Sequence, residues 1–490
     1  MAQKKRPLAS PLAGSPRKKA QRIHAFSRDI LGKLDATAIA EKIRRKQLSP
    51  EEVVKAAIKR AEKVALYIEA IEIYAFADAH EKAKKKDFAD GIFAGVPTFI
   101  KDNSDLEGFP TRNGSRAYSP KIAREHGKYV EQFLKQGFIV LGKTRMPEFG
   151  FNASTEFEGE NPVRNPWNLA YSAGGSSGGS AALVASGVVP IAHANDGGGS
   201  IRIPAACCGL VGLKPTRDRH INSKVAESMP LNIVSEGVLT RTVRDTANFH
   251  FGMEQVYRNP RLKPIGKWEG PSKRKYRIGL VLDSPTGVKT EEDIRQLLLV
   301  TAGKLERLGH VVLEVDMRNT GLEHFVSDFT LYWSLLGFFM GSFGKWILGT
   351  DFDPRRLDPF TKGLVDYYKK NFWQTPAAMY RLWRSRELYE RLIAPYHAIM
   401  TPVLAHTVPP LGHLSPEQGY DSLMEKLQRY VLFTPLNNAA GTPAISLPLG
   451  LDRNGNPIGV QLMAAQGEEG ILIDLAFQLE ADMGFVKIYE

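Results

Sequence analysis

Two glycine- and serine-rich segments stand close together in the chain, residues 174–180 (GGSSGGS) and residues 195–202 (NDGGGSIR). Glycine loses more conformational freedom on folding than any other residue, so clusters of glycine persist where the backbone must approach another group closely or adopt unusual angles. A serine hydroxyl beside several backbone N–H groups supplies a nucleophile and donors for a developing oxyanion. The two segments therefore predict a site for acyl transfer.

Two other motif matches are weaker. Residues 174–178 fit the GxSxG pattern of a nucleophile elbow, but that serine should directly follow an apolar strand, whereas residues 165–168 (NPWN) predict a turn. Residues 137–144 fit the phosphate-loop pattern GxxxxGK[ST], yet their four middle residues are apolar and predict a buried strand rather than a loop with free N–H groups. We therefore favour neither an α/β-hydrolase nor an ATP-binding protein.

Histidine and cysteine offer less than the serines do. His193 precedes Ser200 by seven residues and could serve as a base, although a histidine hydrogen-bonded within the core is the simpler interpretation. Cys207 and Cys208 have no cationic neighbour that would lower a thiol pKa, so we expect them to be packed in the core. Two adjacent cysteines do not indicate a disulfide framework and fit a reducing, cytoplasmic compartment. No Cys/His spacing indicates a metal site, and we expect no cofactor.

Strand and helix patterns alternate around these segments. Residues 49–52 (SPEE) predict a capped helix start, and residues 93–101 predict an apolar strand that ends at Lys101. The alternation predicts an α/β fold: one large domain whose central mixed, mostly parallel β-sheet is covered by helices on both faces. Further strands are expected at residues 138–141, 188–192, 278–282 and 311–315.

Residues 316–400 differ in texture, because they hold longer, aromatic-rich helical segments. We expect a helical, cap-like insertion there. The longest uncharged apolar run, residues 329–344, is shorter than the roughly 20 residues that a membrane span needs. A core helix is the simplest interpretation of this run. A wall of a substrate pocket and a membrane-touching patch are the alternatives.

Positive charge is concentrated at the N-terminus. The chain has a net charge of +12, and residues 1–24 hold seven basic residues and no acidic residue. We expect residues 1–26 to form a basic, disordered tail before a catalytic domain at residues 27–490. The tail lacks the apolar core of an export signal. Its two basic clusters are similar to a nuclear import signal, but a solubilising extension is the simpler interpretation. Nucleic-acid binding is not favoured, because no aromatic residues are interleaved with the charges.

A series of ordered blocks resembles the amidase signature family and covers about residues 30–490, apart from a variable region at 255–400. The order and spacing of the blocks make the resemblance specific. The stretches 155–169 and 193–196 are most similar to the branch that hydrolyses cyclic or linear oligoamides of amino acids. The blocks are residues 95–103, 142–149, 165–168, 174–180, 196–202, 208–216 and 441–448.

The resemblance implies a Ser–Ser–Lys triad. Ser200 matches the nucleophile, Ser176 the bridging serine after a cis peptide bond, and Lys101 the base. A lysine accepts a proton only when it is uncharged, so burial must lower its pKa. The other matched positions are Gly197, Gly198, Gly199 and Ser177 for the oxyanion and the substrate, together with the N–H of Ser200, and Asp196 and Arg202 as braces of the nucleophile loop.

The activity implied by the resemblance is hydrolysis of the C–N bond of a small-molecule carboxamide through a serine acyl-enzyme, which releases a carboxylate and ammonia or an amine. The alternative is the glutaminase (A-type) subunit of a tRNA-dependent amidotransferase, which would act in a complex. For a stand-alone amidase, a homodimer is the assembly considered. Asn195 stands where the family usually has threonine, and residues 217–220 (RDRH) replace a common Gly-Arg pair. Both departures bear on substrate choice and leave the triad positions unchanged.

Overall fold

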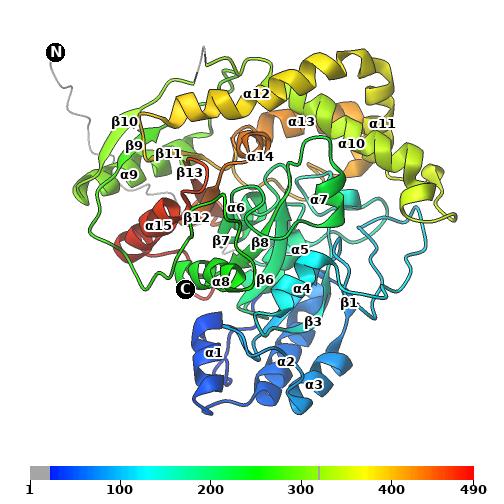
Figure 1. The fold of residues 1–490 in the computed structure, drawn as a ribbon, viewed down its shortest axis with the longest axis vertical. Coiled ribbons are helices and arrows are strands. Elements are labelled where there is room, and N and C mark those ends of the chain that lie inside the picture. The colour runs from blue at the N-terminus through cyan, green and yellow to red at the C-terminus, as the bar shows by residue number, and fades with distance from the viewer. Residues whose placement is uncertain (1–21, 318–319) are drawn as a thin grey trace.

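A mixed eight-stranded sheet lies at the centre of the computed structural model, which describes residues 22–317 and 320–490 (Figure 1). The predicted α/β class and the single domain built on one large mixed sheet are confirmed. The strands of the sheet, in spatial order, are β10 (Val311–Glu314), β9 (Arg277–Leu280), β11 (Ala398–Pro402), β13 (Pro457–Ala464), β12 (Ala444–Leu451), β7 (Val211–Lys214), β8 (Ser235–Thr240) and β6 (Ile191–Asp196).

The expectation that this sheet is mostly parallel is wrong. Only β9 pairs in parallel, with β10 and with β11. The other five pairings are antiparallel. The alternation at residues 278–315 does give a parallel pair, β9 and β10, but β8 lies between β6 and β7 and pairs antiparallel with both. Alternation along the chain therefore does not decide which strands become neighbours.

Helices cover both faces of the large sheet, as predicted. Successive side chains of a strand point to opposite faces, and β12 shows the two layers. Ile445 and Leu447 pack in one apolar cluster with residues of α8 (Val243–Val256), α9 (Glu292–Arg307) and α15 (Glu469–Met483). Ala444 packs on the other side with residues of α12 (Thr375–Ile393) and α14 (Pro435–Ala440). The helix α6 (Arg202–Cys208) also contacts β7, β12 and β13.

A three-stranded sheet lies beside β6 and carries the predicted base. Its order is β1 (Ile71–Tyr74), β3 (Ile139–Thr144) and β2 (Pro97–Lys101), with β2 parallel to β3. Thr98 Oγ1 donates to the carbonyl oxygen of Ile191, and the N–H of Lys101 donates to His193 Nδ1, so β2 is held against β6. This contact places the end of β2 next to the start of the nucleophile loop. Residues 139–144 form a strand, so the rejected phosphate-loop match is not a loop.

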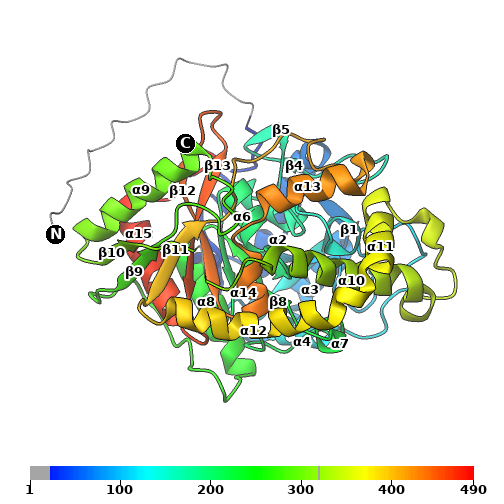
Figure 2. The same ribbon diagram turned by 90° about the horizontal axis from the view of Figure 1, so that it is seen from above.

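Three long helices between β10 and β11 form the predicted cap-like insertion. They are α10 (Phe325–Ile347), α11 (Pro359–Asn371) and α12. Helices α10 and α11 pack side by side (Figure 2). They lie at the end of the molecule opposite α1 (Ala36–Arg44), α2 (Pro50–Ile68) and α3 (Phe76–Lys85) (Figure 1). No helix among the described residues is long and apolar enough to cross a membrane.

The N-terminal tail expected at residues 1–26 falls for the most part outside the described residues, which begin at Arg22. Residues 22–26 make ordered contacts. The N–H of Ala25 donates to the carbonyl oxygen of Ser186, and the guanidinium of Arg22 lies over the ring of Trp167. Phe26 is buried against Tyr489. The body of the fold therefore includes at least five residues before the expected boundary at residue 27.

The predicted helix start at residues 49–52 is confirmed. Ser49 and Glu52 form a capping box at the beginning of α2, with Pro50 as the first helical residue. The remaining elements are α4 (Lys128–Leu134), β4 (Arg164–Asn165), β5 (Asn168–Ser172), α5 (Gly178–Ala185), α7 (Lys224–Ser228) and α13 (Tyr420–Tyr430).

Candidate active site

The three predicted triad residues come from three separate elements. Lys101 is the last residue of β2, Ser176 lies in the loop between β5 and α5, and Ser200 lies in the loop between β6 and α6. The peptide bond between Gly175 and Ser176 is cis, as the resemblance implies. Because β2 is held against β6, the fold brings these loops to the same region of the molecule.

The base and the bridging serine are in direct contact. Lys101 Nζ lies 2.7 Å from Ser176 Oγ and 2.7 Å from Asn195 Oδ1. Lys101 is fully buried, and both partners of its amine are uncharged. The sequence did not identify Asn195 as a partner of the base, because it marked the residue only as a departure from the family pattern.

Burial sets the protonation of Lys101. The loss of hydration disfavours the ammonium form and lowers the pKa of Lys101 to about 7, against the opposing fields of Glu236 and Asp196. A substantial fraction of Lys101 is therefore neutral near pH 7. A neutral amine in contact with a serine hydroxyl can accept a proton.

Ser200 borders a cavity, and Ser176 lies close behind the cavity lining. Ser200 lines the cavity, and so does Gly150. A Cβ atom on Gly150 would lie 3.1 Å from Ser176 Oγ, so the glycine lets the cavity approach the bridging serine. Within the described part of the chain, no hydrogen bond joins Ser200 Oγ to Ser176 Oγ. The first link of the predicted relay is thus seen in the geometry, and the second link stays a prediction.

The glycine run supplies fewer free amide donors than predicted. The N–H of Gly199 donates to Asp196 Oδ1 over 2.7 Å, so in this structure it is not free to bind an oxyanion. Gly199 instead serves the loop conformation, with φ of +135° and a Cβ position only 2.4 Å from Thr434 Oγ1. The N–H groups of Gly197, Gly198 and Ser200 have no hydrogen-bond partner among the described residues, and Gly198 lines the cavity. These three amides are the donors available to an oxyanion.

Ser177 is not in the cavity lining. It is fully buried, and its hydroxyl donates to the carbonyl oxygen of Asn195 over 3.3 Å. This bond ties the loop that precedes α5 to the end of β6. The side chain of Ser177 therefore helps to fix the loop that carries Ser176, and its contact with a substrate stays a prediction.

Asp196 and Arg202 form a fully buried ion pair around the nucleophile loop. Arg202 Nη2 lies 2.9 Å from Asp196 Oδ1, and Arg202 Nε lies 2.9 Å from Asp196 Oδ2. Asp196 also accepts from the N–H groups of Gly199 and Ile201, and Asn438 Nδ2 donates to it over 2.9 Å. The Arg202 guanidinium holds the pKa of Asp196 well below its usual range despite burial. The geometry supports the predicted brace, because one carboxylate fixes both ends of the loop that carries Ser200.

His193 is engaged through both ring nitrogens. Nδ1 accepts from the backbone N–H of Lys101 over 3.2 Å, and Nε2 lies 3.0 Å from Glu236 Oε2. These partners fit a neutral ring with its proton on Nε2. The ring is fully buried and absent from the cavity lining. This arrangement supports the simpler interpretation, a core histidine, over a catalytic base.

The cysteines are packed in the core, as expected. Cys207 and Cys208 lie fully buried on α6, and burial raises the pKa of the Cys207 thiol to about 12. A thiol with such a pKa is a poor nucleophile near neutral pH. Among the described residues, no group of three or more histidine, cysteine, aspartate or glutamate side chains is arranged to hold a metal ion.

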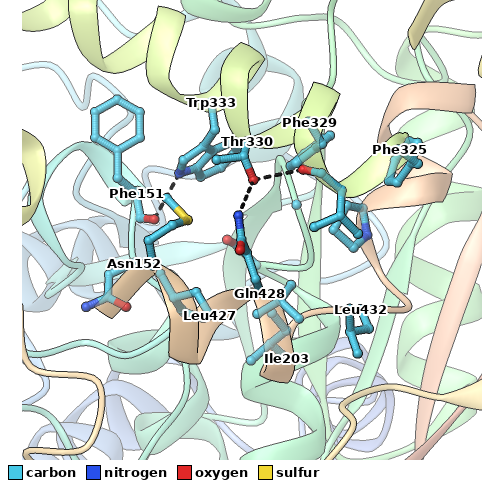
Figure 3. A pocket seen from close by; sticks show the side chains of 18 residues that line it. Phe151, Asn152, Ile203, Phe325, Phe329, Thr330, Trp333, Leu427, Gln428 and Leu432 are labelled. Carbon is cyan, nitrogen blue, oxygen red and sulfur yellow. Dashed lines mark hydrogen bonds between the residues drawn. The ribbon is translucent and has the colours of Figure 1, made fainter. Parts of the chain in front are cut away.

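The cavity next to Ser200 spans about 710 Å³, part of it open to solvent, and its lining is mostly apolar. Phe325, Phe329 and Trp333 of α10 form one wall (Figure 3). The start of the aromatic run is thus a pocket wall, whereas Tyr332 and Leu335 are buried in the core, as the core-helix interpretation predicted. Trp333 Nε1 donates to the carbonyl oxygen of Phe151 over 3.0 Å and so fixes the indole against the opposite loop. No lysine, arginine, histidine, aspartate or glutamate is among the described residues that line the cavity.

A polar pair, Gln428 and Thr330, lies in this apolar lining in addition to Asn152 and Ser200. Gln428 Nε2 donates to Thr330 Oγ1 over 3.1 Å, across the cavity wall from α13 to α10 (Figure 3). Neither residue was found from the sequence. Their positions in the variable cap and in a polar, surface-patterned helix gave no motif, and only the folded structure brings them together.

Comparison with known proteins leads to the family that the sequence blocks resemble. The family model described as Amidase matches residues 52–473. AmiC of Mycobacterium tuberculosis is 45% identical over 468 residues, which covers 96% of this chain and 98% of AmiC. The structure of 6-aminohexanoate cyclic dimer hydrolase superposes with a TM-score of 0.83 at 30% identity and covers 92% of this chain and 97% of that chain. The A-type subunit of the glutamyl-tRNA(Gln) amidotransferase of Halothermothrix orenii is 30% identical, and the match covers 89% of this chain and 94% of the relative.

The chain therefore belongs to the amidase signature family, as the resemblance in its sequence predicted. Membership makes it an amidohydrolase. It does not decide between the stand-alone enzymes and the amidotransferase subunits of the family, because both kinds of protein are among its relatives.

Proposed function

We propose that this amidohydrolase cleaves uncharged carboxamides through an acyl-enzyme on Ser200, with Ser176 and Lys101 as the path of the proton. One observation carries the proposal. The amine of the fully buried Lys101 lies 2.7 Å from Ser176 Oγ, beside a cavity that Ser200 lines. Burial also makes this amine a base near neutral pH.

In the first half of the reaction, Ser200 Oγ attacks the amide carbon while its proton passes to Ser176 and the proton of Ser176 passes to Lys101. The N–H groups of Gly197, Gly198 and Ser200 donate to the oxyanion. Collapse of the intermediate breaks the C–N bond, and Lys101 returns the proton through Ser176 to the leaving nitrogen. Water then hydrolyses the ester, with the same groups as base and acid.

The cavity lining supports an uncharged substrate. An ionised group that leaves water for a site without a partner charge is strongly destabilised, and the described lining offers no charged side chain. Free glutamine would bring an ammonium and a carboxylate. The lining therefore supports a small-molecule amidase over the glutaminase subunit of an amidotransferase. The Gln428–Thr330 pair offers hydrogen bonds to a second amide or carbonyl group of the substrate.

Cyclic and end-blocked amides of aliphatic amino acids fit this description. A cyclic dimer fits because it has no ionised end, and one relative is named 6-aminohexanoate cyclic dimer hydrolase after such a compound. We therefore propose cyclic dimers, simple aryl amides and alkyl amides as the substrate class. The cytoplasmic location, the homodimer and the role of the basic tail stay predictions.

The test is amine release by the purified full-length chain alone, from a cyclic dimer and from the linear dimer of the same ω-amino acid with free ends. We expect turnover of the cyclic dimer to exceed that of the linear dimer, and an acyl group on Ser200 in mass spectra of the quenched enzyme. Ser200→Ala should abolish both signals, and Ser327→Ala, at an exposed serine of α10, is the matched control.

Two other outcomes would overturn the proposed function. Full activity of Ser200→Ala would remove Ser200 as the nucleophile. Turnover of free glutamine that appears only with added amidotransferase partner subunits, without turnover of any uncharged amide, would establish the glutaminase alternative instead.

A further inference from the structure

One face of β6 holds Lys101 at two points. Side chains at positions i and i+2 of a strand share a face, and His193 and Asn195 stand in this relation on β6. His193 Nδ1 accepts from the backbone N–H of Lys101, and Asn195 Oδ1 accepts from its side-chain Nζ. The backbone and the tip of the same lysine are therefore both fixed by one strand.

The atom of Asn195 that meets the amine can only accept. A carboxamide oxygen has no hydrogen to give, so Lys101 Nζ must direct an N–H toward it in the charged and in the neutral state. Neutral Lys101 has two N–H groups and one electron pair in tetrahedral positions. With one N–H held by Asn195 at 2.7 Å, two positions remain, an N–H and the electron pair, and one of them faces Ser176 Oγ, also at 2.7 Å.

We propose that Asn195 is a positioning residue that turns the electron pair of neutral Lys101 toward the hydroxyl of Ser176. The inference rests on the proposed serine–lysine mechanism. The proton count is consistent with it. When the Ser176 proton moves to Nζ, the ammonium keeps its N–H to Asn195 and donates its new N–H to Ser176, so no partner has to change during the cycle.

The bond to Lys101 is the one side-chain hydrogen bond that Asn195 makes in the described structure. Its backbone position does not depend on that bond, because Asn195 pairs with Glu236 in the β6–β8 ladder. The side chain is thus free of a second structural task. A substitution that preserves the shape of Asn195 should therefore report on the amine and leave the strand intact.

The charged and titratable groups around the Lys101 amine show what a charged side chain at position 195 would change. Glu236 on β8 and Asp196 on β6 both favour the ammonium form, and Asp196 is paired with Arg202 of α6. His193 faces the backbone of Lys101, and its partners fit the neutral form. On β3, Lys143 is paired with Asp102. A carboxylate in place of the Asn195 amide would add a negative charge in direct contact with the amine.

The experiment compares pH profiles of kcat and kcat/KM for the wild type, Asn195→Ala and Asn195→Asp, with one neutral amide as substrate. Asn195→Ala removes the acceptor, so we expect kcat on the alkaline plateau to fall roughly 10- to 100-fold, with KM changed by less than about threefold. Asn195→Asp keeps the shape and the acceptor but stabilises the ammonium. Its activity should fall at neutral pH and recover toward the wild-type plateau at alkaline pH.

A purely structural role would not separate the two variants, because both would then lose activity at every pH together with thermal stability. The inference is overturned if Asn195→Ala reaches the wild-type plateau, or if folded Asn195→Asp has an unshifted profile. A fully active Ser200→Ala variant would instead overturn the proposed mechanism itself, so the two failures are distinguishable.

Discussion

Lys101 and Lys143 lie on adjacent parallel strands, β2 and β3, and both are fully buried, yet they meet different partners. Lys143 Nζ lies 2.8 Å from Asp102 Oδ1 and donates to the carbonyl oxygen of Pro110 and to Thr111 Oγ1. Its ammonium group is paired and hydrogen-bonded. Among the described residues, the hydrogen-bond partners of Lys101 Nζ are the uncharged Ser176 and Asn195 alone.

Burial lowers the pKa of both lysines, but Asp102 counteracts the effect at Lys143 through direct contact. The carboxylates that counteract it at Lys101, those of Glu236 and Asp196, form no ion pair with the amine. The comparison shows that depth alone does not make a lysine a base. The partner set decides whether the amine is kept charged or can release its proton.

Lys214 sharpens this conclusion, because it is also fully buried and its pKa is lowered well below the usual value, first by burial. Its amine donates to the carbonyl oxygen of Pro215 and to Ser235 Oγ. Neither partner lines the cavity. Burial and a lowered pKa are therefore not enough to make a lysine a catalytic base. The amine must also contact a hydroxyl next to the site where a substrate binds.

Of the two lysines on β2 and β3, we expect Lys101 to have the larger effect on activity. We expect Lys101→Ala to lower kcat/KM at least as much as Ser176→Ala, by on the order of 10³-fold or more, because both remove the proton path. Steady-state kinetics on a neutral amide, with thermal unfolding as the check on folding, measures this. A Lys101→Ala rate close to that of the wild type would point to another base.

Lys143→Met should act on stability instead. It leaves Asp102 buried without its cation, and removal of one partner of a buried ion pair costs about 3–5 kcal/mol. Urea unfolding measures the loss of unfolding free energy. Lys55→Met is the control, because the exposed Lys55–Glu51 pair should contribute no more than about 1 kcal/mol. Equal stability of the two variants would mean that Asp102 finds another partner.

The pH profile tests the sign of the charge effect at Lys101. The active form is the neutral amine, so kcat/KM should rise as pH increases through about 7 and then level off. Glu236 favours the ammonium, so Glu236→Gln should move this rise to lower pH, while the amide oxygen of the new side chain still accepts from His193. The exposed Glu227→Gln should leave the profile in place. A flat wild-type profile between pH 6 and 8 would contradict the assignment of the base.

Local signals in the sequence were enough for the elements that carry the site. The capping box at Ser49, the strand that ends at Lys101 and the glycine- and serine-rich loop at Ser200 each depend on residues near one another in the chain. The partners of these residues were not readable in the same way. Asn195 reaches Lys101 across 94 positions, and Gln428 reaches Thr330 across 98.

The directions of the strands and the hydrogen bonds of the glycine run could not be predicted from the sequence for a related reason. The position of β8 between β6 and β7 is set by packing of the whole sheet rather than by the alternation of strand and helix. The N–H of Gly199 is taken by Asp196 because the glycine run bends around that carboxylate. A motif gives the residue types of a site, but the competing hydrogen bonds appear only when the loop is folded.

Lys214→Met should have the smallest effect of the three lysine substitutions and completes the comparison. The change removes a buried amine whose pKa is lowered well below its usual value by burial, and it leaves the carbonyl oxygen of Pro215 and the hydroxyl of Ser235 without a donor. An unsatisfied buried polar group costs about 1–3 kcal/mol, partly offset because methionine avoids the desolvation of an amine. We expect a stability loss smaller than that of Lys143→Met and a kcat/KM profile with the same rise through about pH 7.

Kinetics across pH, beside urea unfolding, measures both effects of Lys214→Met. A change in the pH at which kcat/KM rises would mean that Lys214 influences Lys101 through Asp196, whose charge acts on the pKa of both lysines. In that case the two lysines could no longer be treated as independent.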